Sequence, residues 1–187
     1  MSMFKHASQV IDIEQFKPKE HRKADIEPIM PIVTTPPKIV DSTLWNAELK
    51  KGAIQKIYQN ASLENCPLLP QGIVELGKRW ARAKNRASLY LYGNTGSGKT
   101  YFAYCLYRAM IERKIPWILF VKSYDLNEEL LVAIEEKQEK SRIMKYCDVP
   151  ILFIDDLGVE RPSDRIIRQY YSIIDRRVGD GLTTIIT

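Results

Sequence analysis

Cysteine and histidine are scarce in this chain of 187 residues. The three cysteines, Cys66, Cys105 and Cys147, lie far apart in the sequence, and the two histidines, His6 and His21, have no cysteine near them. Disulfide frameworks and zinc sites need several such residues at short, paired spacings. The pattern therefore argues against both kinds of site and is typical of a protein in a reducing cytosol.

Long hydrophobic runs are also missing. The longest ones, at 115–121 and 149–154, are much shorter than the ~20 residues of a membrane-spanning helix. The opening sequence, MSMFKHASQVIDIEQ, holds no apolar stretch of the kind that secretory signals contain. We therefore expect a soluble, cytoplasmic protein with no membrane contact. The net charge of +5 is small, so it fits ordinary solubility as well as contact with nucleic acid.

Glycine is absent from residues 1–40, which contain five of the ten prolines. Proline removes backbone donors and breaks helices, so this segment is predicted to be a flexible arm. Its first third holds enough apolar residues for a short docking segment, namely Phe4, Val10, Ile11, Ile13 and Phe16. Apolar residues then recur every four positions over 41–59, which predicts an amphipathic helix capped by Asp41 or Ser42.

The rest of the chain alternates between helical and strand patterns. A helix is predicted over 71–86, where apolar residues fall on one face. Short apolar runs predict strands over 88–92, 116–121, 150–154 and 182–187. The segments between them predict helices over 99–113, over 125–146 as one helix or two, and over 163–178. The last helix is expected to turn six residues inward: Ile166, Ile167, Tyr170, Tyr171, Ile174 and Val178. Apolar strands separated by helices predict an α/β fold, with a parallel sheet covered on both faces.

A glycine-rich loop, GNTGSGKT, joins the first of these strands to the helix that follows. Its residues, 93–100, match the phosphate-binding pattern G-x-x-x-x-G-K-[ST]. The glycines let successive backbone N–H groups point at one anion, and the helix adds its positive end. Lys99 is expected to contact the β- and γ-phosphates of ATP and assist catalysis, and Thr100 to give its hydroxyl to Mg²⁺. The residues expected to contact ATP or ADP are Gly93, Asn94, Thr95, Gly96, Ser97, Gly98, Lys99, Thr100 and Tyr101.

Two aspartates follow the apolar strand at 151–154. Asp155, at the carboxyl end of that strand, is placed to hold Mg²⁺. Asp156, one residue on, is expected to act as the general base for the attacking water. An apolar run that ends in two acids is a weak pattern by itself, but its place after the glycine loop makes it typical of ATP hydrolysis.

Four pieces of the chain together resemble a known family: GNTGSGKT, ILFIDDLGVE (151–160), YYSIIDRR (170–177) and TTIIT (183–187). Over roughly residues 60–187, the chain resembles the AAA+ ATPases of the DnaC/IstB group, which comprises bacterial and phage replicative-helicase loaders and the transposition helper IstB. The Asp-Asp of IDDLGVE is the most specific part, because most AAA+ proteins carry Asp-Glu there. The resemblance implies a P-loop AAA+ fold and the site roles given above.

The resemblance also implies a function. It favours a helicase loader that delivers the replicative DNA helicase to single-stranded DNA and uses ATP hydrolysis as a switch. Such loaders hold the helicase through their amino-terminal region and assemble into rings, so self-association is also an option. The expected division is a flexible arm over 1–40, a metal-free helical adaptor over 41–62 and an ATPase core over 63–187, with the helicase bound through 1–62.

The family residues that would follow Thr187 include groups that the resemblance links to ATP hydrolysis. Family members continue the TTIIT strand with an asparagine that senses the γ-phosphate. Because the sequence ends at Thr187, we expect a core without its last strand, its helical lid and the arginine that reaches a neighbouring subunit. The resemblance then implies that this chain alone binds nucleotide but hydrolyses ATP slowly.

Two basic segments are candidates for contact with single-stranded DNA. The first, KRWARAKNR at 78–86, carries five bases around Trp80. The second contains Arg161, Arg165, Arg168, Arg176 and Arg177. A solvated basic face, with Trp80 packed in the core, is the alternative that base rates favour.

Three other functions stay open on the sequence. A transposition helper ATPase would share the fold and select target DNA for a transposase. A nucleotide-gated binding module would let ATP or ADP set the shape of a protein-binding surface, without efficient turnover. A small-molecule kinase would share the glycine loop, but the adjacent Asp155 and Asp156 argue against it.

Overall fold

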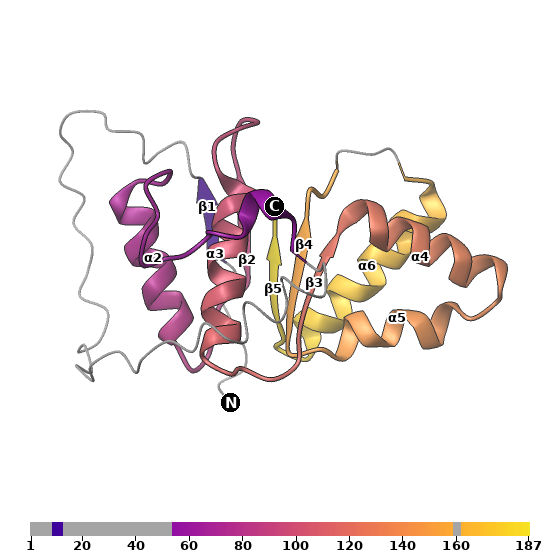
Figure 1. Cartoon of the computed structure of the whole chain (residues 1–187). Coiled ribbons are helices and arrows are strands. Elements are labelled where there is room, and N and C mark those ends of the chain that lie inside the picture. Colours follow the sequence, from indigo (N-terminus) through magenta and orange to yellow (C-terminus); the bar gives the residue numbers. More distant parts are fainter. Residues whose placement is uncertain (1–8, 13–53, 159–161) are drawn as a thin grey trace.

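The computed structural model describes residues 9–12, 54–158 and 162–187 (Figure 1). Their strands form one parallel sheet in the order β1-β2-β5-β4-β3. The bounds are Gln9–Asp12 for β1, Leu89–Tyr92 for β2, Ile118–Lys122 for β3, Ile151–Asp155 for β4 and Thr183–Ile186 for β5. The expected α/β fold, a parallel sheet flanked by helices, is confirmed.

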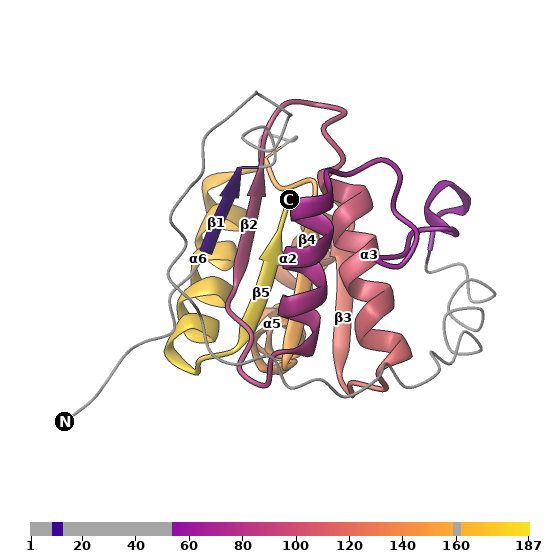
Figure 2. The ribbon, with the colours of Figure 1, turned by 90° about the vertical axis from the view of Figure 1, so that its left-hand side faces the viewer.

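Helices cover both faces of this sheet (Figure 2). The bounds are Gln71–Arg82 for α2, Lys99–Glu112 for α3, Ser123–Glu135 for α4, Glu139–Asp148 for α5 and Asp164–Gly179 for α6. Helices α2 and α3 lie on one face, and α4, α5 and α6 lie on the other. Two apolar clusters correspond to these two layers, so the sheet is the middle layer of three. Across the described residues, no helix is long and apolar enough to cross a membrane.

Strand β4 lies between β5 and β3 and is buried along its whole length. Ile151 and Phe153 belong to the apolar cluster that contains α3, whereas Leu152 and Ile154 belong to the cluster that contains α6. A strand with two buried faces must be apolar at every position, which explains the continuous run before Asp155. The first charged side chain therefore comes at the carboxyl end of the strand.

The segment predicted as one helix or two over 125–146 forms two helices, α4 and α5. The break lies at Lys137, whose φ of 55° is left-handed. Just after it, the amide of Gln138 donates to the carbonyl of Ala133 at 2.8 Å. This hydrogen bond ends many helices, and here a lysine takes the place that glycine usually holds.

The helix predicted over 71–86 ends earlier, at Arg82. Ala83 has an extended backbone, with φ of −63° and ψ of 145°, and leads the chain toward β2. The indole N–H of Trp80 donates to the carbonyl of Ala87 at 2.8 Å, beyond the end of the helix. Trp80 therefore holds this connection against the core.

Helix α6 has two apolar stripes, and one of them faces the sheet. Ile166 and Ile173 are buried, and Tyr170 packs against the same cluster. The prediction was wrong for three residues, which are exposed: Ile167, Tyr171 and Val178. The inner stripe continues through Arg177 instead, because buried hydroxyl and carbonyl oxygens form hydrogen bonds with its guanidinium.

Arg177 is fully buried although it carries a charge. Its guanidinium donates to the hydroxyl of Thr184 at 2.8 Å and to the carbonyls of Tyr146, Val149 and Thr183 at 2.8, 2.6 and 2.6 Å. Burial lowers the pKa of Arg177 to about 10, so the side chain stays protonated at neutral pH. These bonds join α6 to the end of α5 and to the start of β5.

The chain before residue 63 differs from its predicted form where the structure describes it. Strand β1 pairs in parallel with β2 and adds an edge strand that the sequence did not predict. The helix predicted over 41–59 lies outside the described residues up to position 53, and at 56–58 the chain forms a 3-10 turn, η2 (Lys56–Tyr58), rather than an α-helix. Several predicted residues lie outside the described part: Phe4, Ile13, Phe16, Asp41 and Ser42. The division into arm, adaptor and core remains a prediction.

The three cysteines are free thiols. Folding brings two of them near each other, because Cys66 and Cys105 each influence the pKa of the other thiol. Burial raises the pKa of both thiols, so neither is a reactive thiolate at neutral pH.

Candidate nucleotide site

The glycine loop lies between β2 and α3, at the edge where the parallel strands end. Gly98, the residue before α3, has a φ of 92°, in the left-handed region that favours glycine. A Cβ atom at Gly98 would also lie 2.8 Å from Cδ2 of Leu69. Only glycine fits both constraints, and the result is a helix whose positive N-terminal end meets the loop.

The side chain of Lys99 lies over this loop. Its Nζ donates to the carbonyl of Gly93 at 2.9 Å and to the carbonyl of Asn94 at 3.0 Å. These two carbonyls hold the ammonium at the loop rather than in open solvent. A phosphate bound there would meet this charge together with the backbone amides of the loop.

The other predicted contact residues lie along the loop and the first turn of α3. Three of them are exposed: Asn94, Thr95 and Gly96. The hydroxyl of Ser97 is buried and has no hydrogen-bond partner among the described residues. Tyr101 packs against the apolar cluster that contains α2 and α3. A contact between Tyr101 and nucleotide stays a prediction.

Asp155 is 1% exposed, at the end of β4. Its Oδ1 accepts a 2.6 Å hydrogen bond from the hydroxyl of Thr187, whereas its buried Oδ2 has no partner among the described residues. Burial raises the pKa of Asp155, and the hydrogen bond from Thr187 partly offsets that rise. A buried carboxylate oxygen without a partner is costly unless a cation takes it.

The unpaired oxygen of Asp155 and the hydroxyl of Thr100 fit a magnesium ion. Thr100 lies near enough to lower the pKa of Asp155, although no hydrogen bond of good geometry reaches Oδ2. Both groups are hard oxygen ligands, and Mg²⁺ commonly takes its other ligands from phosphates and water. The part of the chain described here holds no group of three His, Cys, Asp or Glu side chains that could bind a metal by itself. Magnesium would therefore bind here together with a nucleotide.

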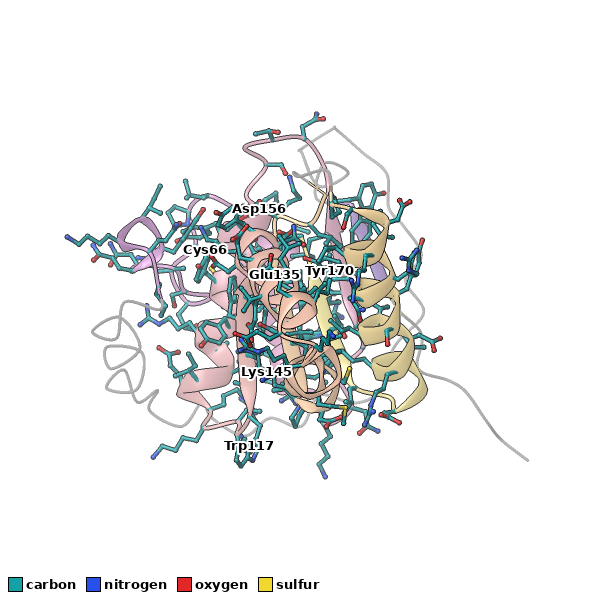
Figure 3. The ribbon with its side chains drawn as sticks, turned by 90° about the vertical axis from the view of Figure 1, so that its right-hand side faces the viewer. Cys66, Trp117, Glu135, Lys145, Asp156 and Tyr170 are labelled. Carbon is teal, nitrogen blue, oxygen red and sulfur yellow. The ribbon has the colours of Figure 1, made fainter. Side chains whose placement is uncertain are left out.

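Asp156 has the opposite environment, because it is exposed. Its φ of 58° is left-handed, a conformation that aspartate adopts more easily than most residues. Its amide donates to the hydroxyl of Thr187 at 2.9 Å. Figure 3 shows Asp156 at one end of the molecule and Trp117 at the other. The two aspartates thus present one buried and one accessible carboxylate at the same edge.

Thr187 is a site residue that sequence reasoning missed. Its hydroxyl contacts both aspartates, its amide donates to the carbonyl of Ile154 at 3.1 Å, and its carbonyl accepts from the amide of Leu157 at 2.9 Å. One residue therefore fixes the turn that follows β4. The available signal was a threonine at the end of TTIIT, since the ends of parallel strands meet at one edge.

Lys122 was also missed. It lies opposite Asp155 in the register of β3 and β4, and its charge lowers the pKa of Asp155. A cation on the neighbouring strand offsets part of the cost of burying this carboxylate. Strand register brings the two together, and no local sequence pattern signals it.

The basic segment at 78–86 is divided between residues with contacts inside the protein and exposed bases. Trp80 is 7% exposed, so the alternative that placed it in the core is confirmed. Lys78 pairs with Glu64 at 3.6 Å, and Arg86 donates to the carbonyl of Ala81 at 3.1 Å. The bases of this segment that are exposed are Arg79, Arg82 and Lys84.

The second basic set is divided in a similar way. Arg177 is buried, and Arg176 pairs with Asp148 at 2.9 Å. Arg165 and Arg168 are exposed, and Arg161 lies outside the described residues. Contact of either set with DNA stays a prediction.

Residues 47–187 match the model of a family described as IstB-like ATP binding protein. The chain belongs to this family. A Sinorhizobium fredii protein named as an insertion sequence ATP-binding protein, y4iQ/y4nD/y4sD, is 38% identical over 123 residues, which cover 64% of the IstB-like chain and 39% of that protein. The replication initiator DnaA of Chloroflexus aggregans is 31% identical over 84 residues, 44% of this chain and 18% of DnaA. The chain thus spans less than two fifths of the length of either relative.

Solved structures share the fold of this IstB-like chain. A DnaC helicase loader is 25% identical with a TM-score of 0.60, over 71% of this chain and 78% of that one. DnaI is 24% identical with a TM-score of 0.58, over 71% and 74% of the two chains. AMPPCP-bound DnaA from Aquifex aeolicus is 16% identical with a TM-score of 0.57, over 67% and 41%. The likeness to DnaI and DnaA shows the fold alone. With the family match, these structures confirm the resemblance to DnaC/IstB-like AAA+ ATPases.

Proposed function

We propose that this chain is an ATP-dependent loader that delivers a replicative DNA helicase to single-stranded DNA, with ATP hydrolysis as its switch. The observation that carries the proposal is the likeness to the DnaC helicase loader, which extends over 71% of this chain and 78% of that one. Membership of an ATP-binding family supports the nucleotide part. The loop, the buried Asp155 and the exposed Asp156 support the chemistry, because they share one edge of the sheet.

The loop and its helix bind the nucleotide in this proposal. The backbone amides of residues 93–98 and the N-terminal end of α3 take the phosphates. Lys99 leaves its two loop carbonyls for the β- and γ-phosphate oxygens. Thr100 and Asp155 hold the magnesium ion, which offsets phosphate charge when it is bound.

Asp156 is the general base of the proposed hydrolysis. It accepts a proton from a water whose oxygen attacks the γ-phosphorus, while the bond from that phosphorus to the bridging oxygen breaks. The products are ADP and inorganic phosphate. Thr187 keeps the backbone of Asp156 in place, so the carboxylate stays at the accessible edge of the site.

The proposed partners follow from the loader function. The helicase would bind through residues 1–62, and single-stranded DNA would bind through exposed bases such as Arg79 and Arg82. Both assignments are proposals for this chain. A phosphate-tracking contact requires that affinity for an oligonucleotide fall as salt rises, and an affinity independent of salt would exclude it.

A second candidate is a transposition helper ATPase. The observation that favours it is the 38% identity to the Sinorhizobium fredii insertion sequence protein over 123 residues. The same site would then switch the selection of target DNA for a transposase. The two candidates share their chemistry and differ in the protein partner.

Nucleotide binding is tested first, with purified wild type, Lys99→Ala and Lys84→Ala. Calorimetry with ADP and with a non-hydrolysable ATP analogue, with and without Mg²⁺, should show binding by wild type that Mg²⁺ strengthens. Lys99→Ala should lose at least tenfold in affinity, because an ammonium is removed from the phosphates. Lys84 is exposed on the connection from α2 to β2, so Lys84→Ala is the matched control and should bind as wild type does. Equal affinity for all three proteins would contradict the proposed site.

The partner is tested by capture on an immobilised hexameric replicative helicase and, in parallel, on a transposase. A loader should bind the helicase in a nucleotide-dependent manner that Lys99→Ala abolishes. Capture by the transposase alone would support the second candidate. Nucleotide-dependent capture with no ATP turnover, even with single-stranded DNA, would instead indicate a nucleotide-gated binding module.

A further inference from the structure

Lys122, the last residue of β3, lies opposite Asp155 in the parallel pairing of β3 and β4. Residues paired in this way lie on strands about 4.8 Å apart and direct their side chains to the same face of the sheet. The preceding pair on that face is Phe120 and Phe153, whose rings stack with centroids 5.4 Å apart and planes inclined by 17°. Strand pairing therefore places the side chains of Lys122 and Asp155 next to each other, at the carboxyl ends of their strands.

Helix α3 covers this face of the sheet. Tyr104 of α3 stacks on Phe120, with ring centroids 4.4 Å apart. Thr100 precedes Tyr104 by four residues, which is one helical turn toward the N-terminal end of α3. On β3, the step from Phe120 to Lys122 leads toward the same edge of the sheet, because α3 begins where the strands end. Thr100, Lys122 and Asp155 therefore share one end of this face.

The charge of Lys122 is not neutralised by a direct contact. In the described part of the chain, no carboxylate lies at ion-pair distance from its ammonium, and its side chain is half-buried. Oδ2 of Asp155 is buried and has no hydrogen-bond donor among the same residues. The two charges still act on each other, because burial raises the pKa of Asp155, whereas Thr187, Thr100 and Lys122 lower it. Lys122 is thus a cation that can attract a further anion at this edge.

Lys99 and Lys122 come to Asp155 from opposite sides. Strand β4 lies between β5 and β3, and β2 lies on the far side of β5. The ammonium of Lys99 is held at the loop that follows β2, by the carbonyls of Gly93 and Asn94, whereas Lys122 ends β3. A phosphate group bound between the loop and Asp155 would therefore have one lysine on each side.

We propose that Lys122 is a second phosphate-binding cation of the nucleotide site, and that its charge lowers the dependence of nucleotide binding on Mg²⁺. Without Mg²⁺, the carboxylate of Asp155 repels the phosphates, and Lys122 offsets part of that repulsion. With Mg²⁺ bound, the ammonium also repels the metal ion, so the net contribution of Lys122 is smaller. This inference rests on the proposed nucleotide-binding function.

The first test compares the affinity for ADP of wild type, Lys122→Met and Lys122→Arg, by calorimetry with EDTA and with saturating Mg²⁺. In EDTA, Lys122→Met should lose roughly fivefold in affinity, since a half-buried charge acts through a high effective dielectric constant. With Mg²⁺, its affinity should change by less than about twofold, because attraction to phosphate and repulsion of the metal ion oppose each other. Lys122→Arg keeps the charge and should match wild type in both conditions.

Lys84→Met is the matched control for the loss of a lysine charge. Lys84 is exposed on the connection from α2 to β2, at the opposite edge of the sheet. Its variant should bind ADP as wild type does in both conditions. Lys122→Gln is a second neutral variant that should reproduce Lys122→Met, and the melting temperature of each protein checks that it is folded.

A second measurement distinguishes a charge effect from a structural one. Each protein is saturated with ADP and titrated with Mg²⁺. Lys122→Met should need roughly fivefold less Mg²⁺ for half-saturation than wild type, because a positive charge next to the metal ion has been removed. A variant that merely distorted the site would bind both ADP and Mg²⁺ more weakly, so the opposite signs of the two effects are specific to the charge.

An equal loss of ADP affinity with and without Mg²⁺ would overturn the inference, and so would wild-type behaviour of Lys122→Met in EDTA. A higher Mg²⁺ requirement in Lys122→Met would overturn it too. In all three cases, binding of ADP by wild type that Lys99→Ala weakens would leave the proposed function standing. A wild type that binds no nucleotide in either condition would contradict the proposed function itself.

Discussion

The hydroxyl of Thr187 donates a 2.6 Å hydrogen bond to Oδ1 of Asp155, and it accepts the amide of Asp156 at 2.9 Å. One side chain beyond the end of β5 thus contacts both carboxylate-bearing residues at the carboxyl end of β4. It also divides the oxygens of Asp155, because Oδ1 has a protein donor and Oδ2 has none among the described residues. The arrangement leaves one buried oxygen for a cation at a defined position.

Replacing Thr187 by valine keeps the shape of the side chain and removes this hydroxyl. Oδ1 of Asp155 then loses the donor that it has among the described residues, and the amide of Asp156 loses its acceptor. We expect a loss of about 1–3 kcal/mol in the free energy of unfolding, the usual cost of leaving such groups unpaired. The strengthening of nucleotide binding by Mg²⁺ should also shrink, because Asp155 is no longer oriented. Denaturant unfolding and calorimetry with and without Mg²⁺ measure the two effects.

Thr183→Val is the matched control for this variant. The hydroxyl of Thr183 donates to the carbonyl of Arg86 at 3.0 Å, at the opposite end of β5. Its removal should lower stability by a similar amount without changing the effect of Mg²⁺. An equal effect on magnesium in both variants would show that Thr187 acts on stability alone.

Asp155 should make the stability of the nucleotide-free protein depend on pH. Burial raises the pKa of this carboxyl in the folded state above its value in the unfolded chain, so the unfolded state ionises first as pH rises. The folded protein therefore loses stability, relative to an Asp155→Asn variant, as pH rises from about 4 through the raised pKa. Melting temperatures of the two proteins between pH 4 and pH 7 test this slope. A constant difference between them would contradict it.

The buried charge of Asp155 should also determine how much Mg²⁺ and nucleotide stabilise the protein. Saturating Mg²⁺ and nucleotide should raise the melting temperature of wild type far more than that of Asp155→Asn, because the cation compensates the buried charge only in wild type. An equal rise in both proteins would place the magnesium elsewhere.

Substitutions at Gly98 and Gly77 should distinguish an effect on nucleotide binding from an effect on core packing. Gly98→Ala places a methyl group 2.8 Å from Leu69 at a φ of 92°, so the loop must shift, and nucleotide affinity should fall by at least tenfold. Gly77 lies in α2, and Gly77→Ala places its methyl group 2.8 Å from the ring of Phe102 on α3. It should cost roughly 1–3 kcal/mol of stability through overpacking, with nucleotide affinity unchanged. Calorimetry and thermal unfolding of both variants check the contrast.

The sequence predicts best where one local pattern decides the structure. The loop at 93–100 and the apolar run of β4 are such cases, because backbone conformation and burial on two faces each demand particular residues. Prediction failed where partners came from distant segments. Thr187 and Lys122 reach Asp155 through strand pairing, which no short pattern records.

Helix α6 shows the same limit for packing. Its sequence contains two apolar stripes, and periodicity alone gave no reason to prefer the one that ends in a charged residue. Arg177 lies in the inner stripe because the hydroxyl of Thr184 and the carbonyls at the end of α5 accept hydrogen bonds from its guanidinium. Val178, one position on, is 64% exposed as a result.

Arg177→Met should therefore be among the most destabilising substitutions in this chain. Methionine fills much of the volume but leaves the carbonyls of Tyr146 and Thr183 buried without their donor. We expect a loss of roughly 3–5 kcal/mol, as when one partner of a buried charged network is removed. Arg176→Met is the control, since Arg176 forms partly exposed ion pairs with Asp148 and Asp180 and its loss should cost at most about 1 kcal/mol. Urea unfolding of both variants measures the difference, and equal midpoints would mean that the network around Arg177 adds nothing to the stability of the fold.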